Sequence, residues 1–121
     1  MPPIIGVVQG AMVLRDAMFA DMNLETMETV VKPKVVGSMH LDAIFRDTPL
    51  DFFVFLSSIA CVAGNPGQSM YAAANMFMTS LAAQRRKRQA RGMVAGRGCG
   101  GWGHGCLGGE EAMRRVGITP R

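Results

Sequence analysis

Four polar residues have types and spacings that suit chemistry at a carbonyl group. The pair Ser57-Ser58 closes an apolar run at 52–56, Tyr71 is the chain's one tyrosine, and Asn75 follows it by four residues. A serine hydroxyl can hold a carbonyl oxygen while a phenol donates a proton to it. A free phenol has a pKa of about 10, so it needs a nearby cation to act near neutral pH. Lys34, in an upstream helical segment, can supply that charge.

Each of these residues also has a purely structural interpretation. Paired serines after a strand usually form a turn or a cap, and a lone lysine is usually on the surface. An asparagine inside a helix is more often solvated or capping. The residue types alone therefore support no more than the hypothesis of an α/β oxidoreductase.

Two apolar runs predict the strands that must position these residues. Residues 4–8 are short, apolar and β-branched, which is typical of a buried strand. Residues 52–56 are apolar at every position, as expected for a central parallel strand covered on both faces. Ser58 then lies at the carboxyl end of that strand, where ligands bind in open α/β sheets.

Helical patterns follow each of the two strands. Asn23 is a suitable N-cap for a helix beginning at Leu24, and Pro33 predicts a break near 32–33. A second helical segment is expected to run from Lys34 to about Arg46, with one apolar face. That face consists of Val35, Met39, Leu41, Ile44 and Phe45.

The last predicted helix carries Tyr71 and Asn75. Residues 64–67 read Gly-Asn-Pro-Gly and predict a loop, after which an alanine-rich helix runs from Ala72 to about Ala90 and stops at Gly92. Strand, helix, strand, loop and helix in this order predict an α/β fold with a parallel sheet and a partial Rossmann-like architecture.

Composition limits the class of protein. The chain has 121 residues, 49% hydrophobic and 18% charged, which fits one domain or part of one. No apolar run reaches the roughly 18–20 residues of a membrane span, so no membrane partner is expected. The N-terminus lacks the order of a signal peptide, and three cysteines cannot all pair within one chain. We therefore expect reduced thiols and a cytoplasmic location.

Three segments together resemble a known family. The segment FVFLSSIACVAGNPGQSMYAAAN at 53–75 is similar to the ketoreductase domain of polyketide synthases, within the short-chain dehydrogenase/reductase superfamily. The segments GVVQGAMVLRDAMF at 6–19 and KPKVVGSMHL at 32–41 resemble the same domain in the expected order. The sequence VVQGAMVLRD within the first of these two segments looks most like the highly reducing synthases of fungi. The resemblance covers roughly residues 4–91.

The resemblance assigns a role to each of the four polar residues. It implies that Ser58 binds the substrate carbonyl, that Tyr71 donates the proton, and that Lys34 favours the tyrosinate. Asn75 takes the place after the tyrosine that holds lysine in simpler relatives, and this exchange is a mark of the ketoreductase branch. Lys34 and Tyr71 are further implied to contact the cofactor.

The implied reaction is the reduction of a β-ketoacyl thioester to the β-hydroxyacyl product with NADPH. The expected partners are a substrate carried on an acyl carrier protein and the rest of a multidomain synthase. The glycine-rich phosphate loop, which the family places after its first strand, has no counterpart at the N-terminus of this chain. We therefore expect the C-terminal half of a catalytic domain, inactive by itself.

The composition changes at Gly92. Residues 92–109 contain nine glycines, so we expect a family-like unit at 1–91 and a glycine-rich, disordered tail at 92–121. The pattern G-x-G-x-x-G at Gly96, Gly98 and Gly101 is nearly automatic in such a stretch and is not interpreted as a cofactor loop. Cys99, His104 and Cys106 lack the paired spacing of a zinc site, so no metal is expected.

Basic residues cluster near the end of the last predicted helix. Arg85, Arg86, Lys87, Arg88 and Arg91 are interpreted as a solvated helix C-terminus, where cations favour the helix dipole. Contact with an acidic carrier protein is an alternative, and nucleic-acid binding is disfavoured because no aromatic residues are interleaved. Two other functions stay open: a catalytically inactive remnant that packs against a partner, and a small basic-helix binding module.

Overall fold

Three parallel strands form the sheet. The computed structural model describes residues 1–88 and, as backbone, residues 93–97. Strand β1 (Gly6–Gln9) pairs with β2 (Phe52–Ser58), which pairs with β3 (Met93–Arg97), in the order β1-β2-β3. Both pairings are parallel. The predicted α/β class with a parallel sheet is confirmed, with the first strand two residues later and the second two residues longer than predicted.

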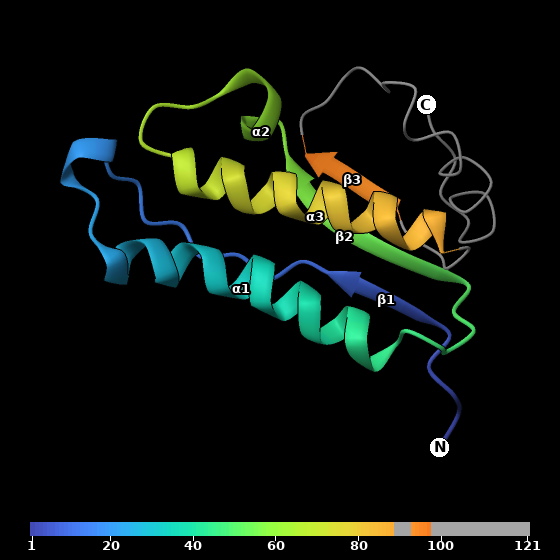
Figure 1. Ribbon diagram of the computed structural model, residues 1–121. Helices are drawn as coiled ribbons and strands as arrows, with labels where there is room; N and C mark the ends of the chain where they lie inside the picture. Colours follow the sequence, from blue (N-terminus) through green and yellow to red (C-terminus); the bar gives the residue numbers. More distant parts are fainter. Residues whose placement is uncertain (89–92, 98–121) are drawn as a thin grey trace.

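Two long helices, α1 (Leu24–Ile44) and α3 (Ser69–Lys87), lie side by side on one face of the sheet (Figure 1). Two short elements, η1 (Phe19–Asp21) and α2 (Ala60–Ala63), precede them. The hydrophobic core fills the space between the sheet and the helices. It consists of Val7, Leu50, Phe53, Phe55, Met78, Leu81 and Ala82.

The opposite face of the sheet is more open. Successive strand residues point to opposite faces, so Val8 and Leu56 lie on the face away from Phe53 and Phe55. Val8 is 56% exposed and Leu56 is 43% exposed, whereas both phenylalanines are fully buried. Among the described residues, β2 is therefore covered on one face, although its sequence is apolar on both.

Helix α1 begins as predicted but does not break at Pro33. The Asn23 side chain caps it by accepting a hydrogen bond from the Thr26 backbone N–H, with an N···O distance of 2.8 Å. The helix is continuous from Leu24 to Ile44, so the break predicted near 32–33 is wrong. Pro33 has no N–H to donate within the helix. Packing on both sides of the proline and a hydrogen bond to its carbonyl from Gln9 hold the two parts in one helix.

The buried face of α1 is largely polar. Its buried residues recur every four positions and are Val30, Lys34, Ser38 and Asp42. Of the apolar face predicted from the sequence, Met39 is 52% exposed and Ile44 is 67% exposed. The predicted face is therefore confirmed only in part: Leu41 and Phe45 pack against the core, whereas the fully buried positions hold polar and charged groups with specific partners.

The loop and the helix around Tyr71 follow the prediction closely. Gly64 and Gly67 adopt φ angles of 74° and 76°, the left-handed region that glycine enters without strain. Helix α3 begins three residues before the predicted start. Its described part ends at Lys87, while Ala90 and Gly92 lie outside the described residues.

The glycine-rich stretch begins with a strand. Residues 93–97 form β3, with Ala95 opposite Leu56 and Arg97 opposite Ser58, so the expected lack of order from Gly92 is wrong for these five residues. Gly96 of the G-x-G-x-x-G pattern lies in this strand. Gly98, Gly101, Cys99, His104 and Cys106 lie outside the described residues.

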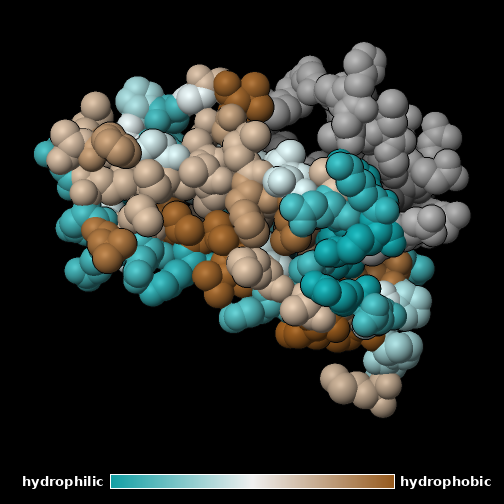
Figure 2. All heavy atoms as spheres, in the orientation of Figure 1, coloured by the Kyte–Doolittle hydropathy of each residue, from teal (hydrophilic) through white to brown (hydrophobic). Residues whose placement is uncertain are grey.

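The surface is hydrophilic at one end of α3. Figure 2 shows hydrophilic side chains gathered over its C-terminal end, where Arg86, Lys87 and Arg88 are exposed. Arg85 is only 1% exposed, so the predicted solvated cluster is wrong for this residue, and Arg91 lies outside the described residues. No helix in the described part of the chain combines the length and the apolar character of a membrane span.

Candidate active site

Three of the four predicted site residues form a chain of contacts near the carboxyl end of β2. The Lys34 Nζ donates a hydrogen bond to the Leu56 carbonyl at 3.0 Å. The same Nζ lies 5.4 Å from the centroid of the Tyr71 ring. The Asn75 Nδ2 in turn donates to the Tyr71 carbonyl at 2.8 Å. Helices α1 and α3 thus bring together Lys34 and Tyr71, which are 37 positions apart in the sequence.

Lys34 is a buried cation. It is 2% exposed, and among the described residues its ammonium has one hydrogen bond, to a backbone carbonyl, and no carboxylate partner. Burial lowers the pKa of Lys34 below the ordinary lysine value of 10.5. The face of the Tyr71 ring offers a further weak attraction to the charge. An ammonium has three donors, so Lys34 keeps donors for another acceptor.

Tyr71 is buried, and its hydroxyl has a weak partner. The ring packs with Val30, Ala60 and Met70, and the residue is 8% exposed. Its hydroxyl donates to the Met12 Sδ at 3.2 Å. A thioether sulfur is a weak acceptor, so a carbonyl oxygen that replaced Met12 would be a better partner for this proton.

Asn75 is fully buried and half satisfied. Its Nδ2 uses one proton on the Tyr71 carbonyl, whereas its Oδ1 has no hydrogen-bond partner among the described residues. A buried polar atom without a partner is costly and calls for an explanation, such as a bound water, an ion or a catalytic role. The amide oxygen is therefore an acceptor that is available next to Tyr71.

Ser58 is the last residue of β2 and is occupied within its own turn. Its Oγ accepts a hydrogen bond from the Ala60 backbone N–H at 3.2 Å, at the start of α2. Its carbonyl accepts from the Cys61 Sγ at 2.8 Å. Among the described residues no hydrogen bond joins Ser58 to Lys34, Tyr71 or Asn75. The structure therefore places Ser58 two residues beyond the Lys34 contact on the strand without linking the two side chains.

Sequence reasoning missed two residues at this site. Gln9 ends β1 and is 5% exposed, although glutamine is usually on the surface. Met12 follows in the next segment and meets the Tyr71 hydroxyl. A polar residue at the carboxyl end of an apolar strand was a signal that applied to Gln9 as well as to Ser58. No sequence signal marked Met12.

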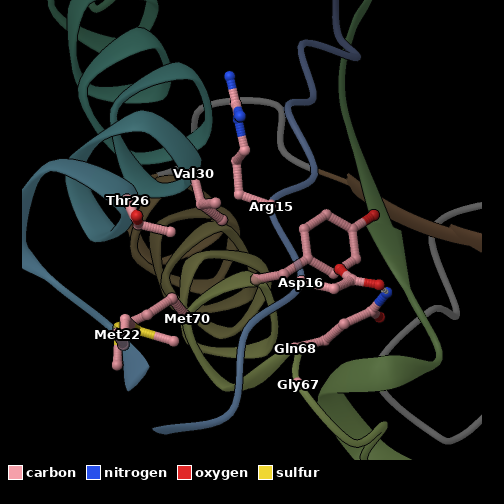
Figure 3. Close-up of a pocket in the computed structure, with 9 residues that line it drawn as sticks. Arg15, Asp16, Met22, Thr26, Val30, Gly67, Gln68 and Met70 are labelled. Atoms are coloured by element: carbon pink, nitrogen blue, oxygen red, sulfur yellow. Dashed lines mark hydrogen bonds between the residues drawn. The ribbon is translucent and has the colours of Figure 1, made fainter. Parts of the chain in front are cut away.

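A shallow pocket opens beside Tyr71 (Figure 3). Two contacts tie the segment before α1 to the loop before α3: the Ala17 N–H donates to the Gly67 carbonyl at 3.0 Å, and the Gln68 Nε2 donates to Asp16 at 3.1 and 3.2 Å. The pocket is lined by Arg15, Asp16, Met22, Thr26, Val30, Gly67, Gln68, Met70 and Tyr71. The pocket has room for about one water molecule beside Tyr71.

Comparison with known proteins assigns the chain to a family. The model of the KR domain family matches residues 1–99. The match extends eight residues beyond the boundary at 91 that glycine content predicts, and it includes β3.

Curated relatives are fungal synthases. The chain is 66% identical over 99 residues to the polyketide synthase-nonribosomal peptide synthetase ACE1 of Pyricularia oryzae, covering 82% of this chain and 2% of that protein. It is 66% identical over 88 residues to the highly reducing polyketide synthase calA of Penicillium decumbens, covering 73% of this chain and 3% of the synthase. The chain thus spans a small part of the relatives that it matches.

Solved structures with a similar fold are ketoreductases. A ketoreductase from the first module of phoslactomycin biosynthesis in Streptomyces sp. HK803 aligns with a TM-score of 0.74 at 35% identity, covering 98% of this chain and 28% of that one. The first ketoreductase of the tylosin polyketide synthase gives a TM-score of 0.73 at 36% identity, with 92% and 25% covered. The chain therefore belongs to the KR domain family, the ketoreductase domains of polyketide synthases.

Proposed function

We propose that this chain carries the proton-transfer half of a ketoreductase that reduces a β-ketoacyl thioester to the β-hydroxyacyl product. The observation that carries the proposal is the buried Lys34 ammonium, which lies 5.4 Å from the centroid of the Tyr71 ring and has no carboxylate partner in the described part of the chain. A buried cation that is not paired is costly to a fold. Beside Tyr71, the one phenol in the chain, this cation can stabilise the tyrosinate that proton donation to a carbonyl would leave.

Each residue has one task in the proposed reaction. Ser58 exchanges its turn hydrogen bond for one to the substrate carbonyl oxygen and orients it. Tyr71 exchanges Met12 for the same oxygen and donates its phenolic proton as the carbonyl becomes an alcohol. Lys34 stabilises the negative charge that this transfer leaves on the Tyr71 oxygen. The Asn75 Nδ2 holds the Tyr71 carbonyl, and its Oδ1, which has no partner among the described residues, is offered to a bound group or water.

The residues present fit one end of NADPH. The spare donors of Lys34 and the Tyr71 hydroxyl suit the hydroxyls of the ribose next to the nicotinamide, and the unpartnered Asn75 Oδ1 adds an acceptor. When bound, NADPH would supply the hydride to the carbonyl carbon. The described loops that follow β1 and β2 do not have the glycine-rich pattern that binds a pyrophosphate, so the described residues provide for the nicotinamide end alone.

Proposed partners follow from the same assignment. The substrate is an acyl group carried on an acyl carrier protein, and the remaining domains are those of a multidomain synthase, as in the relatives named above. An inactive remnant that packs against such domains is the competing function. The two differ in whether Tyr71 affects a rate.

The proposal is tested in a complete ketoreductase domain that joins this segment to the cofactor-binding half of a relative. The rate of NADPH oxidation is measured with a β-ketoacyl thioester analogue. Tyr71→Phe removes the proton donor and leaves the ring, so we expect a loss of about 10²–10⁴-fold. Unchanged urea unfolding of the variant is the control for the fold. A Tyr71→Phe domain that kept its rate would support the inactive remnant.

The 121-residue chain alone provides a second test. We expect it not to oxidise NADPH with the same analogue, because its described residues leave the phosphates and adenosine without partners. NADPH fluorescence measures binding in parallel. Saturable binding with turnover by the chain alone would contradict this expectation.

A further inference from the structure

Gln9 is a buried amide whose hydrogen bonds join β1 to α1 and to the segment that follows β1. Its Nε2 donates to the Pro33 carbonyl at 2.9 Å and to the Ser38 Oγ at 3.4 Å. Its Oε1 accepts from the Ala11 N–H at 3.0 Å. Buried amides need partners, and Gln9 finds them on α1 and on the segment that leaves β1. One side chain thus connects the strand, the helix and the segment that carries Met12.

The contact on α1 falls where the helix is weakest. Pro33 cannot donate to the carbonyl four residues before it, and its ring crowds that carbonyl, so a proline inside a helix loosens or bends it. The hydrogen bond from Gln9 fastens the helix to β1 at this residue. Lys34 is the next residue, and its ammonium must reach the Leu56 carbonyl and the Tyr71 ring.

Gly37 leaves the space that Gln9 occupies. A Cβ at Gly37 would lie 2.9 Å from the Gln9 Nε2, closer than real Cβ atoms come. Glycine inside a helix costs roughly 0.5–1 kcal/mol relative to alanine, so its presence here needs a reason. Access for the Gln9 amide supplies that reason.

Resting on the function proposed above, we propose that Gln9 is a positioning residue that fixes Lys34 against Tyr71 by clamping α1 to β1 at Pro33. The clamp acts on the ammonium through the helix backbone, without touching Lys34 itself. The hydrogen bond from Ala11 gives Gln9 a second effect, because it also directs the chain toward Met12 and the Tyr71 hydroxyl.

The test follows Lys34 directly in the 121-residue chain. The chain has three lysines, Lys32, Lys34 and Lys87, so ¹³C-labelled lysine gives three side-chain signals that NMR can follow with pH. Lys34→Met identifies the Lys34 signal, which we expect to titrate below the ordinary value of 10.5 because the ammonium is buried. The signals of Lys32 and Lys87 are references in the same sample.

Two variants remove the clamp by different routes. Gln9→Met keeps the volume and removes donor and acceptor, whereas Gly37→Ala leaves Gln9 in place and displaces its flexible amide. We expect both to move the Lys34 titration toward the ordinary lysine value and to leave the reference signals unchanged. Gln84→Met, the same substitution at an exposed position of α3, is expected to move nothing.

The outcomes separate a positioning role from a general one. Circular dichroism reports whether each variant folds, and if Gln9→Met does not, Gly37→Ala decides, because alanine favours the helix. A folded Gly37→Ala chain with an unchanged Lys34 titration would overturn the proposal. No step of this test needs catalysis. If both variants shift the Lys34 titration as expected while Tyr71→Phe keeps its rate in the complete domain, the proposed function is overturned and the clamp still holds.

Discussion

Two buried cations lie between α1 and α3, and their surroundings differ. Lys34 contacts a backbone carbonyl and an aromatic ring, and no carboxylate of residues 1–88 pairs with it. Arg85 is 1% exposed, forms an ion pair with the buried carboxylate of Asp42, and stacks over the Phe53 ring at 4.2 Å. Arg88 adds a second ion pair to Asp42, with an N···O distance of 2.8 Å.

We interpret Arg85 as a stabilising charge and Lys34 as the charge that acts in the proposed reaction. Two turns of α1 lie between Lys34 and Asp42, so the same pair of helices holds both sites. The ion pairs satisfy Arg85, hold the helices together, and leave it no free charge for chemistry. Among the described residues no carboxylate pairs with Lys34, and in the proposed function its charge acts on Tyr71. The comparison predicts that variants at one site change a rate and that variants at the other change stability.

The largest expected effect is on the rate. In the complete ketoreductase domain, Lys34→Met removes the cation beside Tyr71 and is expected to reduce NADPH oxidation by about 10²–10⁴-fold. Lys32→Met, at a position whose side chain is 63% exposed, is the matched control and should retain the rate. Equal losses in the two variants would show that the rate does not depend on the cation beside Tyr71.

The next effect is on stability. Asp42→Asn removes the carboxylate that faces Arg85 and Arg88, and breaking a buried pair in this way costs about 3–5 kcal/mol. We expect urea unfolding of the chain to show a loss of this size. Glu28→Gln, which breaks the exposed pair with Lys32 at 2.6 Å, should cost about 0.5 kcal/mol or less. Similar losses for both would mean that the Asp42 cluster is not stabilising.

The Asp42 cluster also predicts a dependence on acid. Burial by itself raises the pKa of Asp42, but hydrogen bonds and charges from Arg85 and Arg88 outweigh it, so the pKa lies below the ordinary value of 3.8. The stabilisation is therefore complete above pH 3.8 and is lost as the pH falls through the lowered pKa. The difference in unfolding free energy between wild type and Asp42→Asn should shrink in this range. A constant difference would contradict the assignment.

The two sites also differ in how far the sequence predicted them. Tyr71, Ser58 and Asn75 stand in motifs at strand and helix ends, where local pattern and family resemblance both apply. The Asp42–Arg85 pair was missed because its members are 43 positions apart and each has an ordinary role on a helix surface. Sequence reasoning also missed the buried polar positions of α1. Hydrophobic periodicity assumes an apolar interior, and here Lys34, Ser38 and Asp42 occupy it.

The tertiary contacts also explain the errors at Pro33 and at the tail. A proline predicts a break only if nothing outside the helix supports it, and Gln9 supports Pro33 from another element. Glycine content predicted no strand at 93–97, yet β2 offers an edge to which that backbone pairs. In both places a long-range hydrogen bond outweighs a local preference.

The smallest expected effect concerns the stability cost of Lys34 itself. Because burial lowers its pKa below 10.5, the folded chain releases this proton at a lower pH than the unfolded chain does. Between those two values the unfolded state binds more protons, so wild-type stability rises with pH. Below them, the cost of the buried ammonium is fully present. We expect the unfolding free energy of Lys34→Met, measured with urea, to be highest relative to wild type near neutral pH.

This advantage should decline as the pH rises toward 10.5, because the variant lacks the rise that wild type gains from releasing the buried proton. The hydrogen bond that the variant loses at the Leu56 carbonyl offsets part of the gain at every pH, so the slope with pH is the quantity to compare. Lys32→Met, measured over the same range, accounts for the loss of a lysine as such. If stability relative to wild type improved with pH instead, Lys34 would be held by an unrecognised anion. Lys34 would then be a paired, stabilising cation, as Arg85 is.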